Sequence, residues 1–566
     1  MRIERLLPFV GCLFFVALSV PQVMEAQTAT AESIDRAELV RKIDAMLEEA
    51  FAADQPGAAV IVTRGGQTEY VAARGMADLE LEVPLRADMV FRLGSITKQF
   101  TAAAIMLLVE EGKVSLDDEI TKFLPDYPTQ GATITVEHLL THTSGIRSYT
   151  DMPGWMETKI VNPLTVKELV DGFKNEPMDF QPDEQFRYNN SGYILLGAII
   201  EEASGQSYAD FIRERIFEPL QMSHSYYGDH ADIINNRAAG YDGPLDNPQN
   251  AKYLDMSQPY AAGSLLSTVE DLGKWNRALF GGKVVNKESL ERMTTNYRLA
   301  DDSEAGYGYG LVPGDVRGHK SVSHGGGIFG FVTYGTYLPD HDVYVAILCN
   351  STSHNPGRLG SRIAALAAGD PFPEFKAVEI SEDILQRYVG VYKIDEESRR
   401  YVTLEDGQLF TIRTGSSRLA ALPFSETEFY YEATPSHFEF VVDDEGVVTG
   451  MRMYQGGSKT AEAATKVDEE MLAEREIADV DFAIYDDYVG EYELAPGFSI
   501  TVTRDGDRLL AQGTGQPALE IFPASETTYF PREVEAEMTF VRDEDGKVNE
   551  LMLKQGGAEI TGKRKE

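Results

Sequence analysis

Ser95 and Lys98 form the only Ser-x-x-Lys pair in this chain of 566 residues. On a helix, side chains three positions apart lie about one turn apart on the same face, so the amine can reach the hydroxyl. A serine hydroxyl becomes a useful nucleophile when a neighbouring base takes its proton, and a buried lysine can be neutral enough to help. The pair predicts acyl transfer on Ser95, although a serine at a helix start beside a solvated lysine would give the same spacing.

The element that must position this pair is a helix from Ser95 to Glu111, with Gly112 where a C-cap is expected. The segment holds good helix formers and no proline. Free backbone N–H groups at its N-terminal end would face a developing oxyanion. Apolar residues cover nearly the whole circumference, which predicts a buried helix with a polar tip. These residues are Phe100, Ala104, Ile105, Met106, Leu107, Leu108 and Val109.

Two further segments hold polar residues next to predicted elements. Residues 182–192 are rich in turn formers and precede an apolar helix over 193–200, so Tyr188 would lie on a loop at its start. A tyrosine there is either a packing residue or, near the ammonium group of Lys98, a phenol able to act as a general base. His324-Gly-Gly-Gly327 opens strands that continue to Cys349, and its glycines suit either a turn or the close approach of a ligand to a strand edge.

His138 and His142 lie four residues apart on another predicted helix, a spacing that can bind zinc. The metalloprotease motif needs glutamate directly after the first histidine, and Leu139 stands there instead. The nine histidines form no third ligand cluster. We therefore expect no metal site and no cofactor.

Residues 1–26 have the pattern of a signal peptide, with two arginines before an apolar run that is short for a membrane span. We expect an exported protein, periplasmic or secreted, without a stable membrane span in the mature chain. The only cysteines are Cys12 and Cys349, so the mature chain is expected to lack an internal disulfide and to bury Cys349 in a strand.

The formal net charge is −40, from 91 Asp and Glu against 51 Lys and Arg. A surface of this sign repels nucleic acids and anionic membranes. The expected partner is therefore a small-molecule or peptide substrate and no nucleic acid. The sequence does not indicate the oligomeric state.

Three motifs occur in a fixed order: Ser95-x-x-Lys98, Tyr188-x-Asn190 and His324-x-Gly326. Together they resemble the motifs of the serine β-lactamase and penicillin-binding-protein superfamily. Because the second motif begins with tyrosine, the chain looks like the class C β-lactamase branch, which also contains D-aminopeptidases, DD-carboxypeptidases and esterases. The segment 139–145, Leu-Leu-Thr-His-Thr-Ser-Gly, matches the same branch. The resemblance covers residues 31–369 and implies an α+β domain, over residues 31–370, with an antiparallel sheet flanked by helices.

The resemblance also implies a role for each residue. Ser95 would be the acylated nucleophile, Lys98 and Tyr188 would share proton transfer, and Asn190 would contact the substrate amide. The backbone N–H groups of Ser95 and Gly327 would form the oxyanion hole. His324 and Gly326 would belong to the substrate-binding strand.

One residue of the third motif departs from the lactamase pattern and narrows the range of expected substrates. Lactamases usually have lysine at the start of the third motif, whereas His324 is expected to be largely neutral near pH 7. This weakens the case for penicillins and D-Ala-D-Ala ends and favours aminopeptidase-like or esterase-like substrates. An α/β-hydrolase is the rival enzyme class, because His324-Gly-Gly-Gly327 resembles a lipase oxyanion motif. That fold needs Gly-x-Ser-x-Gly, which is absent from the chain.

The C-terminal part is a tandem duplication with a period of 100 residues, beyond the proline-bearing link 370–374. Tyr388-Val-Gly-Val-Tyr392 recurs as Tyr488-Val-Gly-Glu-Tyr492, and the segments 425–427 and 455–457 recur at 525–527 and 555–557. Alternating runs and Asp-Gly turns predict small antiparallel barrels or sandwiches over 377–470 and 480–566. A catalytic domain followed by two lipocalin-like barrels resembles the three-domain D-aminopeptidases.

These patterns predict an exported serine hydrolase that cleaves amide or ester bonds of D-amino-acid peptides, amides or short esters through an acyl-enzyme. β-Lactamase or DD-carboxypeptidase activity is one alternative. A catalytically inert lactamase-like binding protein is the other. The preferred acyl group, its stereochemistry and the role of the barrels are not encoded in any motif.

Overall fold

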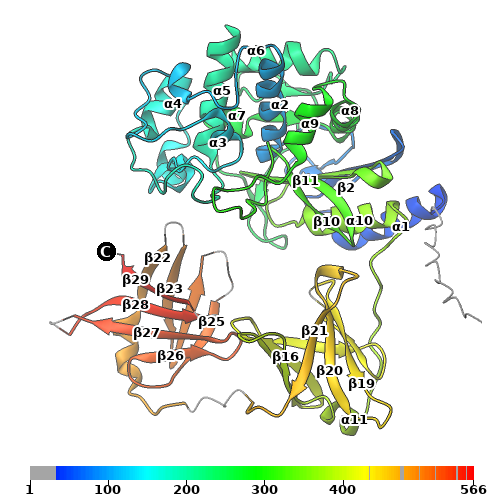
Figure 1. Cartoon of the computed structure of the whole chain (residues 1–566), viewed down its shortest axis with the longest axis vertical. Coiled ribbons are helices and arrows are strands. Elements are labelled where there is room, and N and C mark those ends of the chain that lie inside the picture. The colour runs from blue at the N-terminus through cyan, green and yellow to red at the C-terminus, as the bar shows by residue number, and fades with distance from the viewer. Residues whose placement is uncertain are drawn as a thin grey trace, which may run out of the picture.

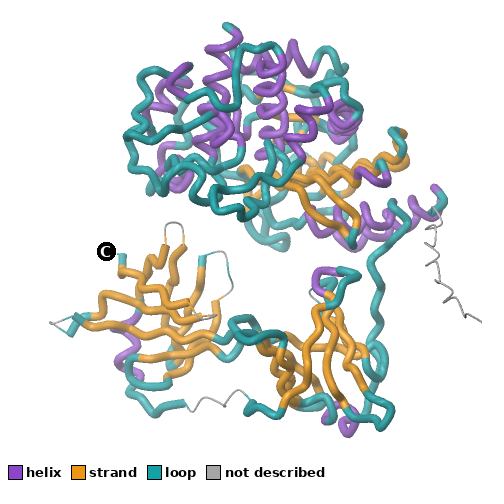
Figure 2. Tube along the Cα trace, in the orientation of Figure 1, coloured by secondary structure: helices purple, strands orange, loops and turns teal. Residues whose placement is uncertain are grey.

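The computed structural model describes residues 34–565 except 433, 472–476, 496–497, 515, 517, 544–545 and 556–557. The predicted signal peptide lies outside the described residues. Figure 1 shows a large N-terminal unit and two smaller C-terminal units that lie side by side, and Figure 2 shows that helices concentrate in the first and strands in the other two. Within the described ranges, the helices are too short or too polar to cross a bilayer.

The N-terminal unit is built on a six-stranded antiparallel sheet of order β10-β11-β12-β13-β1-β2. β1 and β2 pair as an antiparallel hairpin, and Cys349 ends β13 fully buried as expected. The bounds are β10 Val312–Val316, β11 His319–Ile328, β12 Phe331–Leu338, β13 Val343–Cys349, β1 Ala58–Arg64 and β2 Gln67–Arg74.

Both faces of this sheet are buried, because alternate side chains of its strands enter two different cores. Val60 and Val62 pack with helices α1 (Arg36–Ala50) and α10 (Pro356–Ala367) on one face. Ile61 and Ala59 belong to the larger core on the other face, together with helices α2 (Thr97–Glu110) and α5 (Asn190–Ser204). The predicted α+β fold, an antiparallel sheet flanked by helices, is confirmed.

The helix that carries Ser95 and Lys98 begins differently from the prediction. Instead of one α-helix from Ser95, the chain makes a 3₁₀ turn, η1 (Gly94–Ile96), and then enters α2 (Thr97–Glu110). The cause is at Gly94, whose φ of 55° is left-handed. A Cβ at Gly94 would lie 2.9 Å from the carbonyl oxygen of Gly327, so the turn is pressed against strand β11. Most of α2 is buried, as its apolar circumference predicts.

The remaining elements of this unit include one further long helix, α5, and several short helices and strands. His138 and His142 do not share a helix, because α3 ends at Leu140 and His142 has a left-handed φ of 60°. The helices are α3 Val136–Leu140, α4 Val166–Phe173, α5 Asn190–Ser204, α6 Tyr208–Ile212, α7 Tyr260–Gly263, α8 Val269–Phe280 and α9 Lys287–Thr294. The short strands are β3 Met76–Asp78, β4 Val83–Pro84, β5 Phe91–Arg92, β6 Tyr226–Tyr227, β7 Tyr241–Asp242, β8 Gln249–Asn250 and β9 Leu265–Ser267.

The C-terminal part forms two closed eight-stranded barrels, each preceded by one short helix: β14–β21 with α11 (Glu382–Gln386) and β22–β29 with α12 (Tyr485–Tyr488). The first barrel consists of β14 Gly390–Lys393, β15 Arg399–Glu405, β16 Gln408–Arg413, β17 Leu419–Pro423, β18 Glu428–Tyr430, β19 His437–Val442, β20 Val448–Tyr454 and β21 Glu462–Val467. The second consists of β22 Gly490–Ala495, β23 Phe498–Asp505, β24 Arg508–Gly513, β25 Ala518–Pro523, β26 Thr528–Pro531, β27 Ala536–Arg542, β28 Val548–Gln555 and β29 Ala558–Arg564.

The repeated tyrosines explain why both copies fold alike. In the first barrel, the Tyr392 hydroxyl donates to the Tyr388 carbonyl over 2.7 Å, and in the second Tyr492 donates to Tyr488 over 2.8 Å. All four side chains are fully buried. The duplicated sequence thus repeats the same buried hydrogen bond at the start of each barrel.

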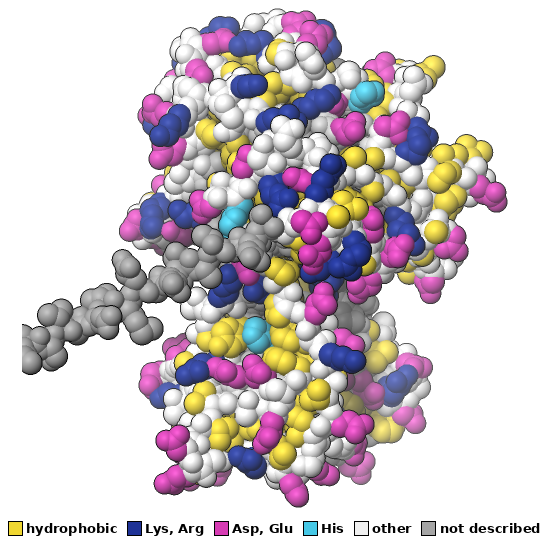
Figure 3. All heavy atoms as spheres, turned by 90° about the vertical axis from the view of Figure 1, so that its right-hand side faces the viewer, with side chains coloured by type: hydrophobic (Ala, Val, Ile, Leu, Met, Phe, Trp, Pro, Cys, Tyr) yellow, Lys and Arg dark blue, Asp and Glu magenta, His cyan; other side chains and the backbone are white. Residues whose placement is uncertain are grey.

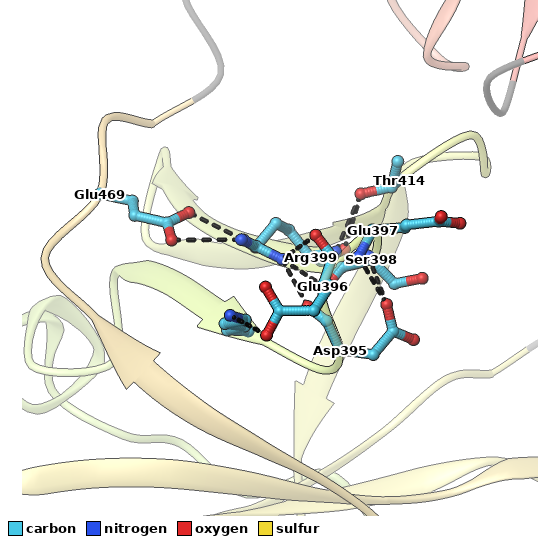
Figure 4. A network of polar contacts seen from close by, with 8 residues as sticks. Asp395, Glu396, Glu397, Ser398, Arg399, Thr414 and Glu469 are labelled. Atoms are coloured by element: carbon cyan, nitrogen blue, oxygen red, sulfur yellow. Dashed lines mark hydrogen bonds and ion pairs between the residues drawn. The ribbon is translucent and has the colours of Figure 1, made fainter.

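Charged residues are paired at several turns of the barrels. Figure 4 shows the β14–β15 turn, where the Asp395 carboxylate accepts from the backbone N–H groups of Glu397 and Ser398. Arg399 then pairs with Glu469 over 2.8 Å, which ties the turn to the chain that leaves β21. On the face in Figure 3, acidic side chains are spread over the upper and lower units with basic ones scattered among them, as the net charge of −40 implies.

Candidate active site

Ser95, Lys98 and Asn190 meet where η1, α2 and the start of α5 converge. The Lys98 amine lies 3.2 Å from the Ser95 hydroxyl, 2.8 Å from Asn190 Oδ1 and 2.9 Å from the carbonyl oxygen of Ala262 in α7. Lys98 is completely buried, and no carboxylate forms an ion pair with it in the described part of the chain. The predicted contact between the serine and the lysine is present.

The partners of Lys98 determine where its protons go. Burial holds the pKa of the amine well below its usual range, which favours the neutral form. A neutral amine has two N–H donors and one lone pair, and the oxygens of Asn190 and Ala262 can only accept. In the neutral amine both N–H groups are used there and the lone pair is left for the Ser95 hydroxyl, whereas a protonated amine would donate to all three oxygens. This is the arrangement of a general base facing a nucleophile.

Tyr188 lies on the loop before α5, as predicted, with its ring centroid 4.8 Å from the Lys98 amine. Although 37% of the residue is exposed, burial of its surroundings raises the pKa of the phenol, and a hydrogen bond with Ser95 only partly opposes this. Burial disfavours both a phenolate on Tyr188 and an ammonium group on Lys98 in the resting site, and the general-base role of Tyr188 stays a prediction. In this site Tyr188 is a neutral phenol that can donate a proton.

His142 holds the loop that carries Tyr188. Its carbonyl oxygen accepts from the Arg187 N–H, its Nδ1 accepts from the Asn189 N–H over 3.1 Å, and its ring packs 4.4 Å from the Tyr188 ring. Both neighbours of Tyr188 are thus hydrogen-bonded to one buried residue. Because Nδ1 accepts, a neutral His142 carries its proton on Nε2, which has no hydrogen-bond partner among the described residues.

His324 is buried on β11 and neutral, as predicted. Burial, with a smaller contribution from Lys98, lowers its pKa to about 4. Its Nδ1 lies 2.5 Å from the Gly325 carbonyl oxygen, which can only accept, so Nδ1 carries the proton. Nε2 then accepts from the buried Tyr307 hydroxyl over 2.8 Å. A fixed cation for a substrate carboxylate is absent at this position.

The glycines of β11 allow the strand to lie directly against the serine turn. A Cβ at Gly326 would lie 2.1 Å from the Leu93 carbonyl oxygen, whereas one at Gly327 would meet nothing within 4 Å. Strand β10 pairs with β11 only as far as Ser323, so the edge from His324 to Ile328 is not covered by β10. Gly327, Gly94 and Ser95 all line the same pocket. The two predicted oxyanion donors, Ser95 and Gly327, thus border one space.

This pocket has a volume of about 310 Å³ and lies between η1, the end of β11 and the loop around Tyr149 and Thr150. Asn190 also lines it. The amide nitrogen of Asn190 donates to Thr150 Oγ1 over 3.1 Å, and its second N–H has no partner among the described residues. That N–H is available for the predicted contact with a substrate amide.

Sequence reasoning missed His142 and Tyr307 as parts of the site. The sequence offers His142 only as half of a four-residue zinc spacing, and no motif includes Tyr307. The segment Leu139–Gly145, which matches the resembled branch, held a signal for His142. Its role in holding the loop of Tyr188 depends on a hydrogen bond from Asn189, which lies 47 residues away in the sequence. Groups of three or more His, Cys, Asp or Glu placed to bind a metal do not occur within the described ranges.

Residues 39–370 match the family model described as beta-lactamase. The chain belongs to the beta-lactamase family. This family membership agrees with the resemblance seen in the three motifs, and it makes the protein a member of a family of serine hydrolases. The residues 375–475 and 474–564 each match a domain of unknown function, DUF3471.

Several family members are similar to this chain. Penicillin-binding protein 4* of Bacillus subtilis (strain 168) is 32% identical over 436 residues, which cover 72% of this chain and 94% of that protein. A D-aminopeptidase of Gluconobacter oxydans (strain 621H) is 25% identical over 311 residues, covering 54% of this chain and 61% of the aminopeptidase. The structure of D-amino acid amidase from Ochrobactrum anthropi SV3 with L-phenylalanine amide superposes with a TM-score of 0.51 at 27% identity, covering 59% of this chain and 97% of the amidase.

Proposed function

We propose that this protein is an exported serine hydrolase of the class C β-lactamase type that cleaves small amides or esters through an acyl-enzyme on Ser95. The hydrogen-bond set of Lys98 carries the proposal, because it leaves the amine lone pair facing the serine hydroxyl. Export rests on the signal-peptide pattern of residues 1–26.

The reaction begins when Lys98 takes the Ser95 proton as the serine oxygen attacks the substrate carbonyl carbon. The carbonyl oxygen becomes an oxyanion, which the backbone N–H groups of Ser95 and Gly327 stabilise. Tyr188 passes a proton to the departing amine or alcohol and is reprotonated from Lys98, so the amine ends the step neutral. A water molecule then attacks the acyl carbon by the same route and releases the acid and free Ser95.

The character of the site favours amino-acid amides, peptides or short esters over substrates that carry a carboxylate. His324 is neutral because its pKa is about 4, and the lining of the pocket contains no lysine or arginine. D-Aminopeptidase and D-amino acid amidase among the relatives support substrates of the D series. β-Lactamase or DD-carboxypeptidase activity is the second candidate, supported by the similarity to penicillin-binding protein 4*.

Intact-protein mass spectrometry with a chromogenic substrate panel tests the proposal. The mature chain is mixed with D-alanine p-nitroanilide, p-nitrophenyl butyrate and nitrocefin, and chromophore release is followed together with the acyl adduct. We expect release from the anilide or the butyrate and its loss in Ser95→Ala. Release from nitrocefin alone would support the lactamase. If no chromophore is released from any of the three substrates and no acyl adduct forms, the result would support an inert binding protein.

A further inference from the structure

The pocket beside Ser95 combines an apolar wall with one charged side chain. Of the residues that line it, only Asp242 carries a charge at neutral pH. The wall consists of Met156, Ile160, Leu254, Pro259, Ile328 and Phe329. A space of about 310 Å³ with this lining fits one apolar group together with one cationic group.

The carboxylate of Asp242 is fixed at the end of the strand edge that faces Ser95. Asp242 ends β7, and its Oδ1 accepts from the Gly330 N–H over 3.2 Å and from Thr352 Oγ1 over 3.0 Å. Gly330 follows β11, which includes Gly327, so the carboxylate is bound to the turn directly after the strand that carries the oxyanion donor. The contacts of Asp242 keep it oriented without neutralising it.

The negative charge of Asp242 is not paired with a cationic side chain of the described residues. In the described part of the chain Asp242 forms no ion pair, and both of its hydrogen bonds are made by Oδ1, which leaves Oδ2 for a ligand. A partly buried carboxylate beside an apolar wall gains most from a cation that enters with the substrate. The net charge of −40 also raises the local concentration of cationic ligands.

We propose that Asp242 binds the ammonium group of the substrate, so that the enzyme selects amides, short peptides or esters that carry a free amino group next to an apolar side chain. This inference rests on the proposed acyl-enzyme function and names its substrate class. A charge-assisted hydrogen bond of this kind corresponds to roughly a 10- to 100-fold preference over the same substrate without the charge.

The test compares substrates that differ only in the amino group. The kcat/KM of wild type and of Asp242→Asn is measured on phenylalanine p-nitroanilide and on its N-acetyl form, each as D and L isomers, with p-nitrophenyl butyrate as a neutral reference. Asparagine keeps an oxygen that can accept from Gly330 and Thr352. Asp246→Asn is the matched control, because Asp246 is an exposed carboxylate four residues away that does not line the pocket.

We expect Asp242→Asn to lower kcat/KM on the free amine at least 10-fold, mainly through KM, with less than a 3-fold change on the butyrate and no effect of Asp246→Asn. Equal losses on charged and neutral substrates, or wild-type values on both, would overturn the ammonium site. If Ser95→Ala kept either activity, the acyl-enzyme proposal itself would fail, which separates the two outcomes.

A second readout does not need turnover of an anilide. Labelling of Ser95 by a fluorophosphonate is followed with phenethylamine or 3-phenylpropanoate as a competing ligand. Phenethylamine should slow labelling of wild type and not of Asp242→Asn, and 3-phenylpropanoate should protect neither. Protection by the anion in wild type would contradict the inference.

Discussion

The close approach of Gly326 to the serine turn gives a prediction whose size follows from the structure. An alanine Cβ at position 326 would lie 2.1 Å from the Leu93 carbonyl oxygen and 2.3 Å from Thr333 Oγ1, whereas real Cβ contacts are essentially never below 3.0 Å. Leu93 or strand β11 must therefore move by about 0.9 Å. Leu93 stands two residues before Ser95, and Gly326 directly precedes Gly327. The movement thus separates the two oxyanion donors.

A misplacement of about 1 Å in a catalytic site can lower the rate on the order of 100-fold. We therefore expect Gly326→Ala to lower kcat on p-nitrophenyl butyrate by about 100-fold, which corresponds to about 2.7 kcal/mol of transition-state stabilisation. Overpacking should also reduce the free energy of unfolding by roughly 1–3 kcal/mol.

Gly325→Ala is the matched control, because a Cβ there would lie 3.7 Å from its nearest neighbour, the Thr333 carbonyl oxygen, which is an ordinary contact. This variant should keep nearly the wild-type rate. Circular dichroism and urea unfolding confirm that both variants are folded at the assay temperature. A folded Gly326→Ala with the wild-type kcat would refute the reasoning, and an equal loss in Gly325→Ala would show that the strand tolerates no side chain for a different reason.

Other predictions concern protons in the site. Lys98→Met should lower the rate of Ser95 acylation by about 100- to 10,000-fold, the usual contribution of a general base, as measured by fluorophosphonate labelling. In wild type kcat/KM should rise with pH through the lowered pKa of Lys98, since only the neutral amine accepts the serine proton. Tyr188→Phe should lower the high-pH plateau of this kcat/KM profile and leave the pH of its midpoint unchanged. His142→Phe should lower kcat more than it changes KM, and His142→Asn, which tolerates the left-handed φ and keeps an acceptor for Asn189, should restore most of it. His324 has a pKa of about 4 in the folded state against about 6.5 in the unfolded state, so its contribution to the free energy of unfolding is fully present above pH 6.5 and is lost as the pH falls toward 4. Urea unfolding should therefore show that His324→Gln loses about 3 kcal/mol less stability than wild type over this pH range.

Local patterns predicted the elements of the catalytic unit well. The apolar circumference of residues 100–109 predicted a buried helix, and the spacing of Ser95 and Lys98 predicted their contact at 3.2 Å. The prediction that the α-helix begins at Ser95 was wrong, since Ser95 lies in a 3₁₀ turn. Its form depends on Gly94 meeting Gly327, a contact between residues more than 200 positions apart that no local propensity contains.

The protonation states were predicted only in part. The neutrality of His324 followed from the ordinary pKa of histidine, and burial strengthens it. The sequence left Tyr188 open between a packing residue and a general base, because spacing alone gives no measure of desolvation. In the structure, desolvation raises the pKa of the phenol and lowers that of the Lys98 amine. Both pKa shifts come from the packing of α2, α5 and the loop that carries Tyr188, which is a feature of the tertiary structure.

The pKa shifts of Lys98 and His324 both disfavour a positive charge in the site before substrate binds. Lys98 is held toward its neutral form, His324 is neutral above pH 4, and Tyr188 keeps its proton. Stabilisation of the oxyanion then falls to backbone N–H groups, whose position is set by how closely β11 approaches η1. The same lack of cations leaves Asp242 as the only charge in the pocket. One architecture therefore accounts both for a lysine that can act as a base and for a preference against anionic substrates, so a variant that introduces a cation, such as His324→Lys, should weaken binding of amines and slow acylation together.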